Sequence, residues 1–288
     1  MARRLSLRGL LVLVAAFLAL APAVAREHTA LPNAADSLKF AVIGDNGTGK
    51  APQYEVGAQM AALRSRFAFD LVLMLGDNMY GRQRPDDFVE KFERPYAPLL
   101  AAGVEFRAAL GNHDSPSNRF YKGFGMNGAR YYAFAEKDVR FVVLDTNLLD
   151  PEQIAWFERT LAAATERWKI CYFHHPLYSN AGRHGSNVET RVVLEPLLVR
   201  YGVSVVFAGH DHAYERSVPQ KGITHFVQGA SGQLRKGDIE PNPGTATFFD
   251  QDRSFTAVEI VGDQLVFQTI SRTGQVVDSG TIARRTGT

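Results

Sequence analysis

Short apolar runs alternate with longer amphipathic stretches from residue 38 onward, a pattern typical of α/β proteins. The apolar runs predict strands at residues 38–43, 71–75, 104–110, 170–173 and 203–208. A hairpin is predicted from residues 131–134 and 140–144, with its turn near Lys137. Helices are predicted at residues 54–66, 151–166 and 188–201. Asp150 and Pro151 give the second helix a strong start signal, whereas Pro196 predicts a kink or a break in the third.

The last third of the sequence has a different pattern. Three strand-like runs at residues 255–261, 264–270 and 275–282 are separated by turn residues and predict a β-meander. Residues 234–252 are rich in glycine and proline and predict a long loop. Because no repeat, low-complexity tract or linker divides the sequence, we predict a single domain over residues 38–288.

Residues 1–25 predict a signal peptide. Three arginines precede an apolar run at residues 10–21, and Ala23-Val24-Ala25 gives the small-x-small pattern of a cleavage site. A retained N-terminal anchor is the alternative, and Arg3-Arg4 partly resembles a twin-arginine export signal. We therefore expect an exported protein, periplasmic or secreted, with an exposed segment at residues 26–37 and no stable membrane association after cleavage.

Composition excludes one class of function. The formal net charge is +2, and no basic stripe is interleaved with aromatic residues, so we expect no nucleic-acid partner. The sequence carries no signal for the oligomeric state.

Polar residues of one chemical kind follow five of the predicted strands. In strand order they are Asp45; Asp77 and Tyr80; Asn112 and His113; His174 and His175; and His210 and His212. Ligands of open α/β sheets bind outside the carboxyl ends of the strands, so these clusters should converge on one site.

The residue types indicate metal binding. Carboxylate, amide, phenol and imidazole donors without thiolate suit iron, manganese or zinc. Seven ligands drawn from these residues exceed what one ion with an open position needs, whereas two ions about 3.5–4 Å apart would use seven. Because successive strand residues point to opposite faces, only one of His174 and His175 is expected to face the site directly.

The ordered motifs resemble those of the calcineurin-like metallophosphoesterase superfamily. They are Gly44-Asp45, Gly76-Asp77-Asn78-Met79-Tyr80, Gly111-Asn112-His113-Asp114, His174-x-Pro176 and Gly209-His210-x-His212. The position of Tyr80, three residues after Asp77, resembles the motif of the purple acid phosphatases. His184-Gly185 resembles a motif of their low-molecular-weight, tartrate-resistant branch. The resemblance runs from about residue 39 to the C-terminus and implies a two-sheet β-sandwich flanked by helices, an αββα fold.

The resemblance also implies roles for individual residues. Asp77 would bridge two ions. Asp45, Tyr80 and His212 would complete the first site, and Asn112, His174 and His210 the second. The spacing to Pro176 favours His174 over His175. His113 and His184 would face the phosphate.

Tyr80 bears on the identity of the first ion. A phenol with a pKa near 10 is a poor ligand unless a strong Lewis acid deprotonates it, so we expect Fe(III) there and a divalent ion, Fe, Zn or Mn, at the second site.

The expected activity is hydrolysis of small phosphomonoesters by metal-bound hydroxide. His113, which Asp114 would orient, or His184 would act as general acid. The alternatives are a phosphodiesterase or nucleotidase of the same superfamily, and a non-catalytic protein that binds phosphate or metal.

Overall fold

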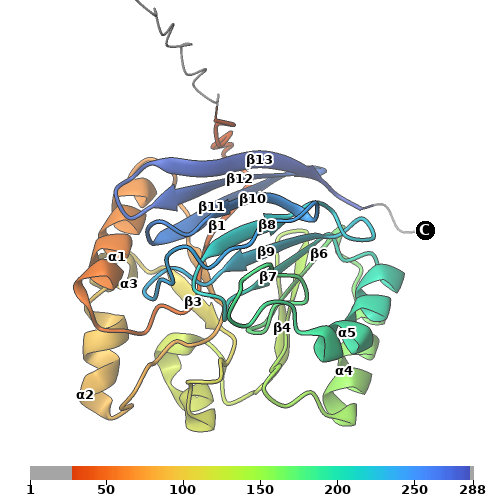
Figure 1. Ribbon diagram of the computed structural model, residues 1–288, viewed down its shortest axis with the longest axis horizontal. Coiled ribbons are helices and arrows are strands. Elements are labelled where there is room, and N and C mark those ends of the chain that lie inside the picture. Colours follow the sequence, from red (N-terminus) through yellow and green to blue (C-terminus); the bar gives the residue numbers. More distant parts are fainter. Residues whose placement is uncertain (1–27, 286–288) are drawn as a thin grey trace, which may run out of the picture.

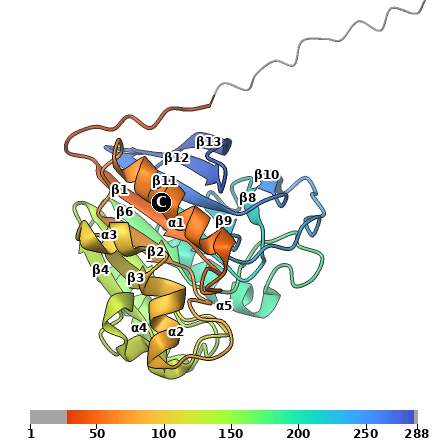
Figure 2. The same cartoon turned by 90° about the vertical axis from the view of Figure 1, so that its left-hand side faces the viewer.

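A computed structural model describes residues 28–285, which form two mixed β-sheets packed between two groups of helices (Figure 1). The first sheet has the order β13-β12-β11-β1-β2-β3, and the second has the order β10-β8-β9-β7-β6-β5-β4. Helices α1, α2 and α3 lie on one side and α4 and α5 on the other, so the predicted αββα sandwich is confirmed. Figure 2 views the molecule from the side of α1, with this helix in front of the first sheet.

The elements have the following bounds. The strands of the first sheet are β1 (Leu38–Ile43), β2 (Leu71–Met74), β3 (Glu105–Ala108), β11 (Ser254–Val261), β12 (Gln264–Ser271) and β13 (Val276–Ala283). The strands of the second sheet are β4 (Tyr132–Glu136), β5 (Val139–Val143), β6 (Trp168–Tyr172), β7 (Val205–Ala208), β8 (Tyr214–Ser217), β9 (Thr224–Gln228) and β10 (Thr245–Phe249). The helices are α1 (Ala51–Arg64), α2 (Pro85–Phe88), α3 (Ala97–Ala101), α4 (Pro151–Ala163) and α5 (Val188–Arg200), with a π-helical turn η1 (Val89–Glu93) and 3₁₀ turns η2 (Pro116–Phe120) and η3 (Lys122–Phe124).

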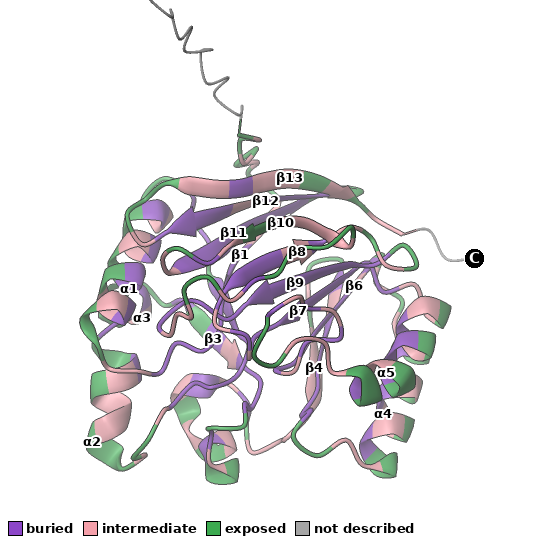
Figure 3. Ribbon diagram, viewed as in Figure 1, coloured by how far each residue is buried: buried purple, intermediate pink, exposed green. Residues whose placement is uncertain are grey.

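Three apolar layers hold these elements together, and alternate residues of β1 belong to two of them. Phe40 and Val42 pack between the two sheets, whereas Ala41 and Ile43 pack against the layer under α1 and α3. A third layer fills the space between the second sheet and helices α4 and α5. Figure 3 shows the result: the central strands are buried and the helices expose their outer faces. Strands buried on both faces are apolar throughout, which is why the sequence shows them as continuous runs.

The parallel strands place the candidate site. Strands β1, β2 and β3 are mutually parallel in the first sheet, and β5, β6, β7 and β9 are parallel in the second. The loops that follow β1, β2 and β3 therefore emerge at one edge of the first sheet, and those that follow β6 and β7 emerge at one edge of the second. These are the loops that carry the predicted ligands.

Most predicted elements are present, with shifted ends. The five predicted strands are β1, β2, β3, β6 and β7; the hairpin is β4–β5; and the meander is β11, β12 and β13. The side chain of Asp150 accepts a hydrogen bond from the amide of Gln153, which confirms it as the cap of α4. Helix α1 begins three residues earlier than predicted, with Pro52 in its first turn.

Two local predictions are wrong. Helix α5 continues through Pro196, so the predicted break does not occur. The carbonyl that loses its partner there belongs to Val192, which is 69% exposed, so water can bind it. The predicted loop at residues 234–252 contains β10, because its glycines and prolines end at Gly244 and leave Thr245–Phe249 free to pair with β8.

The N-terminal segment is held against the first sheet. The buried carboxylate of Glu259 accepts hydrogen bonds from the amides of Asn33 and Ala34 and from the hydroxyl of Ser37. The predicted signal peptide lies outside the described residues. Within residues 28–285, no helix has both the length and the apolar character needed to cross a bilayer.

The burial of His225 on β9 leads us to expect that the free energy of unfolding falls at acidic pH. It is 3% exposed, its ring packs 4.8 Å from that of Tyr178, and neither ring nitrogen has a hydrogen-bond partner among the described residues. Burial lowers the pKa of His225 to about 3. The folded protein therefore keeps His225 neutral, whereas the unfolded chain binds a proton near pH 6.5, so this residue makes the fold less stable as the pH falls from 6.5 towards 3.

We expect His225→Phe to reduce that loss. Between pH 6.5 and 4.5 the variant should retain up to about 2.7 kcal/mol more of its free energy of unfolding than the wild type does. Urea unfolding of the metal-free proteins at a series of pH values measures this. The exposed His28 supplies the control variant His28→Ala, and equal pH dependence of His225→Phe and wild type would contradict the prediction.

Candidate metal centre

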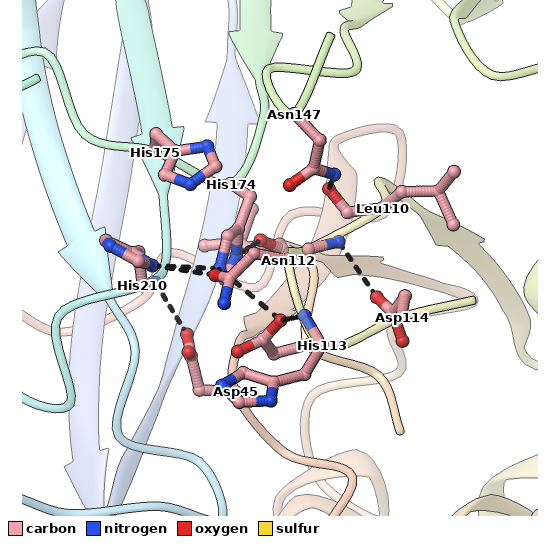
Figure 4. Close-up of polar contacts among 12 residues, drawn as sticks. Asp45, Leu110, Asn112, His113, Asp114, Asn147, His174, His175 and His210 are labelled. Carbon is pink, nitrogen blue, oxygen red and sulfur yellow. Dashed lines mark hydrogen bonds and ion pairs between the residues drawn. The ribbon is translucent and has the colours of Figure 1, made fainter. Parts of the chain in front are cut away.

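The predicted ligands meet where the two sheets adjoin. The first sheet contributes Asp45, Asp77, Tyr80 and Asn112 from the loops after β1, β2 and β3, and the second contributes His174, His210 and His212 from the loops after β6 and β7. Figure 4 shows the part of this site around Asn112, His174 and His210. The side chains fall into two groups, and Asp77 lies close to both.

The first group surrounds Asp45. Its Oδ1 lies 3.0 Å from the Tyr80 hydroxyl and 3.4 Å from Nε2 of His212, and the Tyr80 hydroxyl lies 3.1 Å from the same nitrogen. Asp45, Asp77 and His212 each offer a ligand atom within 4.8 Å of the others. A carboxylate, a phenol and an imidazole thus converge on one point.

The second group surrounds His174. Its Nε2 lies 3.0 Å from Oδ1 of Asn112 and 3.2 Å from Nδ1 of His210, and Asn112 Oδ1 lies 3.0 Å from the same His210 nitrogen. Nδ1 of His174 faces the carbonyl oxygen of Leu75 at 2.9 Å, which leaves Nε2 available as a ligand.

Asp77 lies between the two groups. Its Oδ1 is 3.5 Å from Nε2 of His174, and it accepts a hydrogen bond of 2.8 Å from the amide of His113. Because Asp77 also belongs to the first group, a single carboxylate is within reach of both.

The backbone at three of these positions adopts the left-handed conformation. Asp45 and Asp77 have φ of 52° and His210 has φ of 72°, which residues other than glycine rarely adopt and which costs about 1–3 kcal/mol each. Surrounding bonds hold the conformation: the amide of His210 donates to Oδ2 of Asp45 at 2.8 Å. The neighbouring Gly111 allows the close approach, because a Cβ there would lie 2.1 Å from the amide nitrogen of Asp77.

Burial and neighbouring charges shift the ionisation of the oxygen ligands. Burial and the adjacent carboxylates of Asp45 and Asp77 raise the pKa of Tyr80 far above its ordinary value. Burial and the charge of Asp45 likewise raise the pKa of Asp77. Burial opposes ionisation of Asp45 too, but its hydrogen bond with His212 and the nearby histidines outweigh that effect and lower its pKa.

His210 and His175 favour their neutral forms, whereas the pKa of His174 is raised, because the charges of Asp77 and Asp45 outweigh the effect of its burial. Burial, followed by the charge of His174, lowers the pKa of His210 to about 3 and that of His175 to about 4. Neutral imidazole is the form that binds a metal ion.

These residues fit a pair of cations. Asp45 and Asp77 are 0% and 1% exposed, and among the described residues no lysine or arginine pairs with either. Buried carboxylates without a cationic partner are costly, and ring nitrogens of His174 and His210 lie within 3.2 Å of each other and 3.0 Å of Oδ1 of Asn112. Bound cations would resolve both features.

The two predicted catalytic histidines lie at the rim of the site. The ring of His113 packs 4.7 Å from that of Tyr80, and the ring of His184 packs 4.3 Å from that of His210. Both side chains are exposed, and each packs against a member of a different ligand group. Burial, followed by the charges of Arg235 and Arg183, lowers the pKa of His184.

Asp114 has a different role from the one predicted. Among the described residues it makes no hydrogen bond to the His113 side chain. It accepts bonds from the amides of Gly111, Asn78 and Met79 at 2.8, 3.1 and 2.9 Å. Asp114 therefore ties the loop after β3 to the loop after β2, and so fixes the spacing of Asn112 and Asp77.

His175 also lies at the site, which the alternation argument did not foresee. His174, His175 and His210 each offer a ring nitrogen within 4.8 Å of the others. The argument fails because β6 ends at Tyr172, so both histidines lie in the following loop, where strand alternation no longer applies. The sequence signal was the adjacent pair itself.

Comparison with known proteins gives a consistent result. The family model described as calcineurin-like phosphoesterase matches residues 38–214. Purple acid phosphatase 17 of Arabidopsis thaliana is 26% identical over 266 residues, covering 76% of each protein. Human tartrate-resistant acid phosphatase type 5 is 25% identical over 312 residues, covering 88% of this chain and 95% of that protein. The motif-based resemblance is confirmed.

Solved structures show the same fold. The purple acid phosphatase PPD1 from yellow lupin seeds superposes with a TM-score of 0.72 at 22% identity, over 88% of this chain and 55% of that one. GAP50, described as the anchor in the inner membrane complex of Plasmodium, superposes with a TM-score of 0.74 at 18% identity, over 87% and 90%. Because proteins with such different descriptions share the fold, function must be argued from the site.

Proposed function

Because this chain belongs to the calcineurin-like phosphoesterase family, we propose that it hydrolyses small phosphate monoesters at the two groups of ligands around Asp77. Its family and its acid phosphatase relatives make it a metal-dependent phosphatase. Preference for monoesters is the proposed step beyond that, and the acid phosphatase names of the relatives support it.

One observation carries the proposal: the two groups share a carboxylate. Asp77 is grouped with Asp45 and His212 and also lies 3.5 Å from Nε2 of His174. Paired sites with a shared ligand are the arrangement of two-metal hydrolases. Two bound ions would activate water for attack on phosphorus and offset the charge of the phosphoryl oxygens.

The side chains around the ligands would bind the substrate and move a proton. His113 and His184 are exposed and pack against Tyr80 of the first group and His210 of the second, so we propose that the phosphate binds between them. We propose that one of them donates a proton to the departing alcohol.

The test compares two substrates on metal-analysed protein. We expect 4-nitrophenyl phosphate to be hydrolysed with a kcat/KM at least about tenfold above that for bis(4-nitrophenyl) phosphate, and loss of both activities after chelation. Preference for the diester would favour the phosphodiesterase alternative. A protein that holds two metal equivalents, binds phosphate and hydrolyses neither substrate would be a binding protein, and the proposal would be wrong.

We also propose Fe(III) at the site of Tyr80. Burial beside two carboxylates raises the pKa of Tyr80, so its phenolate requires a strong Lewis acid. We expect purified protein to absorb visible light through charge transfer from the phenolate, and Tyr80→Phe to lose that absorption. Visible spectra and iron analysis of both proteins measure this.

Tyr54 provides the matched control for that experiment. Its hydroxyl donates to the carbonyl of Glu90 on the exposed side of α1, so Tyr54→Phe should keep the colour. A colourless, active and iron-free wild-type preparation would exclude iron while leaving the phosphatase proposal intact.

Export is a further part of the proposal. The basic start, the apolar run and the Ala23-Val24-Ala25 site support it. We expect the mature protein to begin at Arg26, which N-terminal sequencing of the periplasmic or secreted material measures. Full-length protein retained in the cytoplasm would contradict export.

A further inference from the structure

His175 is a histidine of the site to which neither the ligand motifs nor the predicted catalytic roles assign a function. Its ring centroid lies 5.0 Å from that of His174 and 4.5 Å from that of His210. In Figure 4 it lies on the same side of the site as these two rings.

Thr146 fixes the orientation of His175. The Thr146 hydroxyl accepts a bond of 3.1 Å from the backbone amide of His175 and lies 2.9 Å from its Nδ1. Thr146 is itself 8% exposed and follows β5, so a buried side chain makes this contact. Since Nδ1 is engaged there, Nε2 is the nitrogen left to bind an ion. Metal-binding histidines are commonly held in this way through their other ring nitrogen.

The spacing of the three imidazoles matches one cation. Zinc–nitrogen bonds of about 2.0–2.1 Å place two nitrogens of one ion about 3.3 Å apart when adjacent and about 4.2 Å apart when opposite. His174 Nε2 and His210 Nδ1 are 3.2 Å apart, and all three residues offer nitrogens within 4.8 Å. The largest nitrogen–nitrogen separation in the group therefore exceeds 4.2 Å by less than about 1 Å. A small rotation of the His175 ring would close this gap.

We propose that His175 is a third imidazole ligand of the second site and makes that site select zinc over manganese. With His174, His210, Asn112 and Asp77, the divalent ion would have three nitrogen and two oxygen donors. Imidazole favours zinc, whereas manganese prefers oxygen donors. This inference rests on the proposed dinuclear site but does not depend on what the site hydrolyses.

The test measures metal binding without substrate. Metal-free wild type and His175→Ala are titrated with Zn²⁺ and, separately, with Mn²⁺ by calorimetry. We expect His175→Ala to weaken one of the two zinc-binding events by at least about 100-fold, while manganese affinity changes by less than about fivefold. The visible absorption bands of the Co²⁺-loaded protein should also differ between His175→Ala and wild type.

Two further variants make the result specific. His28→Ala removes an exposed histidine and should leave both titrations unchanged. Thr146→Val keeps the His175 ring but removes the hydroxyl that orients it, and should weaken zinc about 10–100-fold even if His175→Ala folds poorly.

Zinc affinity of a folded His175→Ala protein within about threefold of wild type would overturn the inference. An unchanged zinc affinity with an altered KM would mean that His175 contacts the substrate instead, and would overturn it equally. A protein that binds zinc through His175 but hydrolyses no phosphate ester would refute the proposed function and leave this inference standing.

Discussion

Asp77→Asn is expected to lose the paired metal ions and to lower kcat/KM by about 10³-fold or more, equivalent to about 4 kcal/mol of transition-state stabilisation. Asp77 is the carboxylate within reach of both ligand groups, beside Asp45 and His212 on one side and His174 on the other. An amide has no charge to offset two cations. Metal analysis by mass spectrometry, combined with the monoester assay, measures both effects.

A buried aspartate elsewhere controls for damage to the fold. Asp278 is 7% exposed and pairs with Arg216, away from the site. Asp278→Asn should lower the melting temperature but keep two metal equivalents per chain. If Asp77→Asn also kept two equivalents, Asp77 would not be the shared ligand.

Gly111→Ala is the second change with a large expected effect. A Cβ at Gly111 would lie 2.1 Å from the amide nitrogen of Asp77 and 2.2 Å from its Oδ1. The two loops must then separate, and a displacement of about 1 Å at a catalytic site can cost about 10²-fold. We expect kcat/KM to fall by about that factor, together with weaker metal binding in calorimetric titrations.

The control substitutes another glycine of the loops near the site. A Cβ at Gly182 has Glu240 Oε1, at 3.3 Å, as its nearest contact, on a side chain that can move. Gly182→Ala should therefore retain wild-type activity. Equal activity of Gly111→Ala and Gly182→Ala would show that the loops after β2 and β3 adapt without harm to the centre.

The convergence of the candidate ligands could be predicted from the sequence because they follow parallel strands. Asp45, Asp77 and Asn112 come directly after apolar runs, and runs of that kind end at a common edge of the sheet. His174 was placed by its spacing to Pro176. For His175, alternation gave the wrong answer, since it holds along a strand and not beyond its end at Tyr172.

What the sequence did not predict depends on contacts between distant segments. Strand β10 pairs with β8, about thirty residues earlier, and no local pattern indicates that partner. The connecting role of Asp114 is a similar case. Its position in the motif suggested a partner for His113. Its carboxylate instead accepts hydrogen bonds from amides of two loops, which lie together only in the folded protein.

The ligand groups draw on both sheets, which ties metal loading to the order of folding. The bond between His210 and Asp45 joins residues 165 positions apart, so the centre cannot form until the chain has been synthesised beyond residue 212 and the sheets have docked. A chain threaded unfolded across a membrane would have to acquire its ions on the far side. Bound cations would link the two sheets of the sandwich. We therefore expect chelation to make the interface between the sheets the first part of the protein to open.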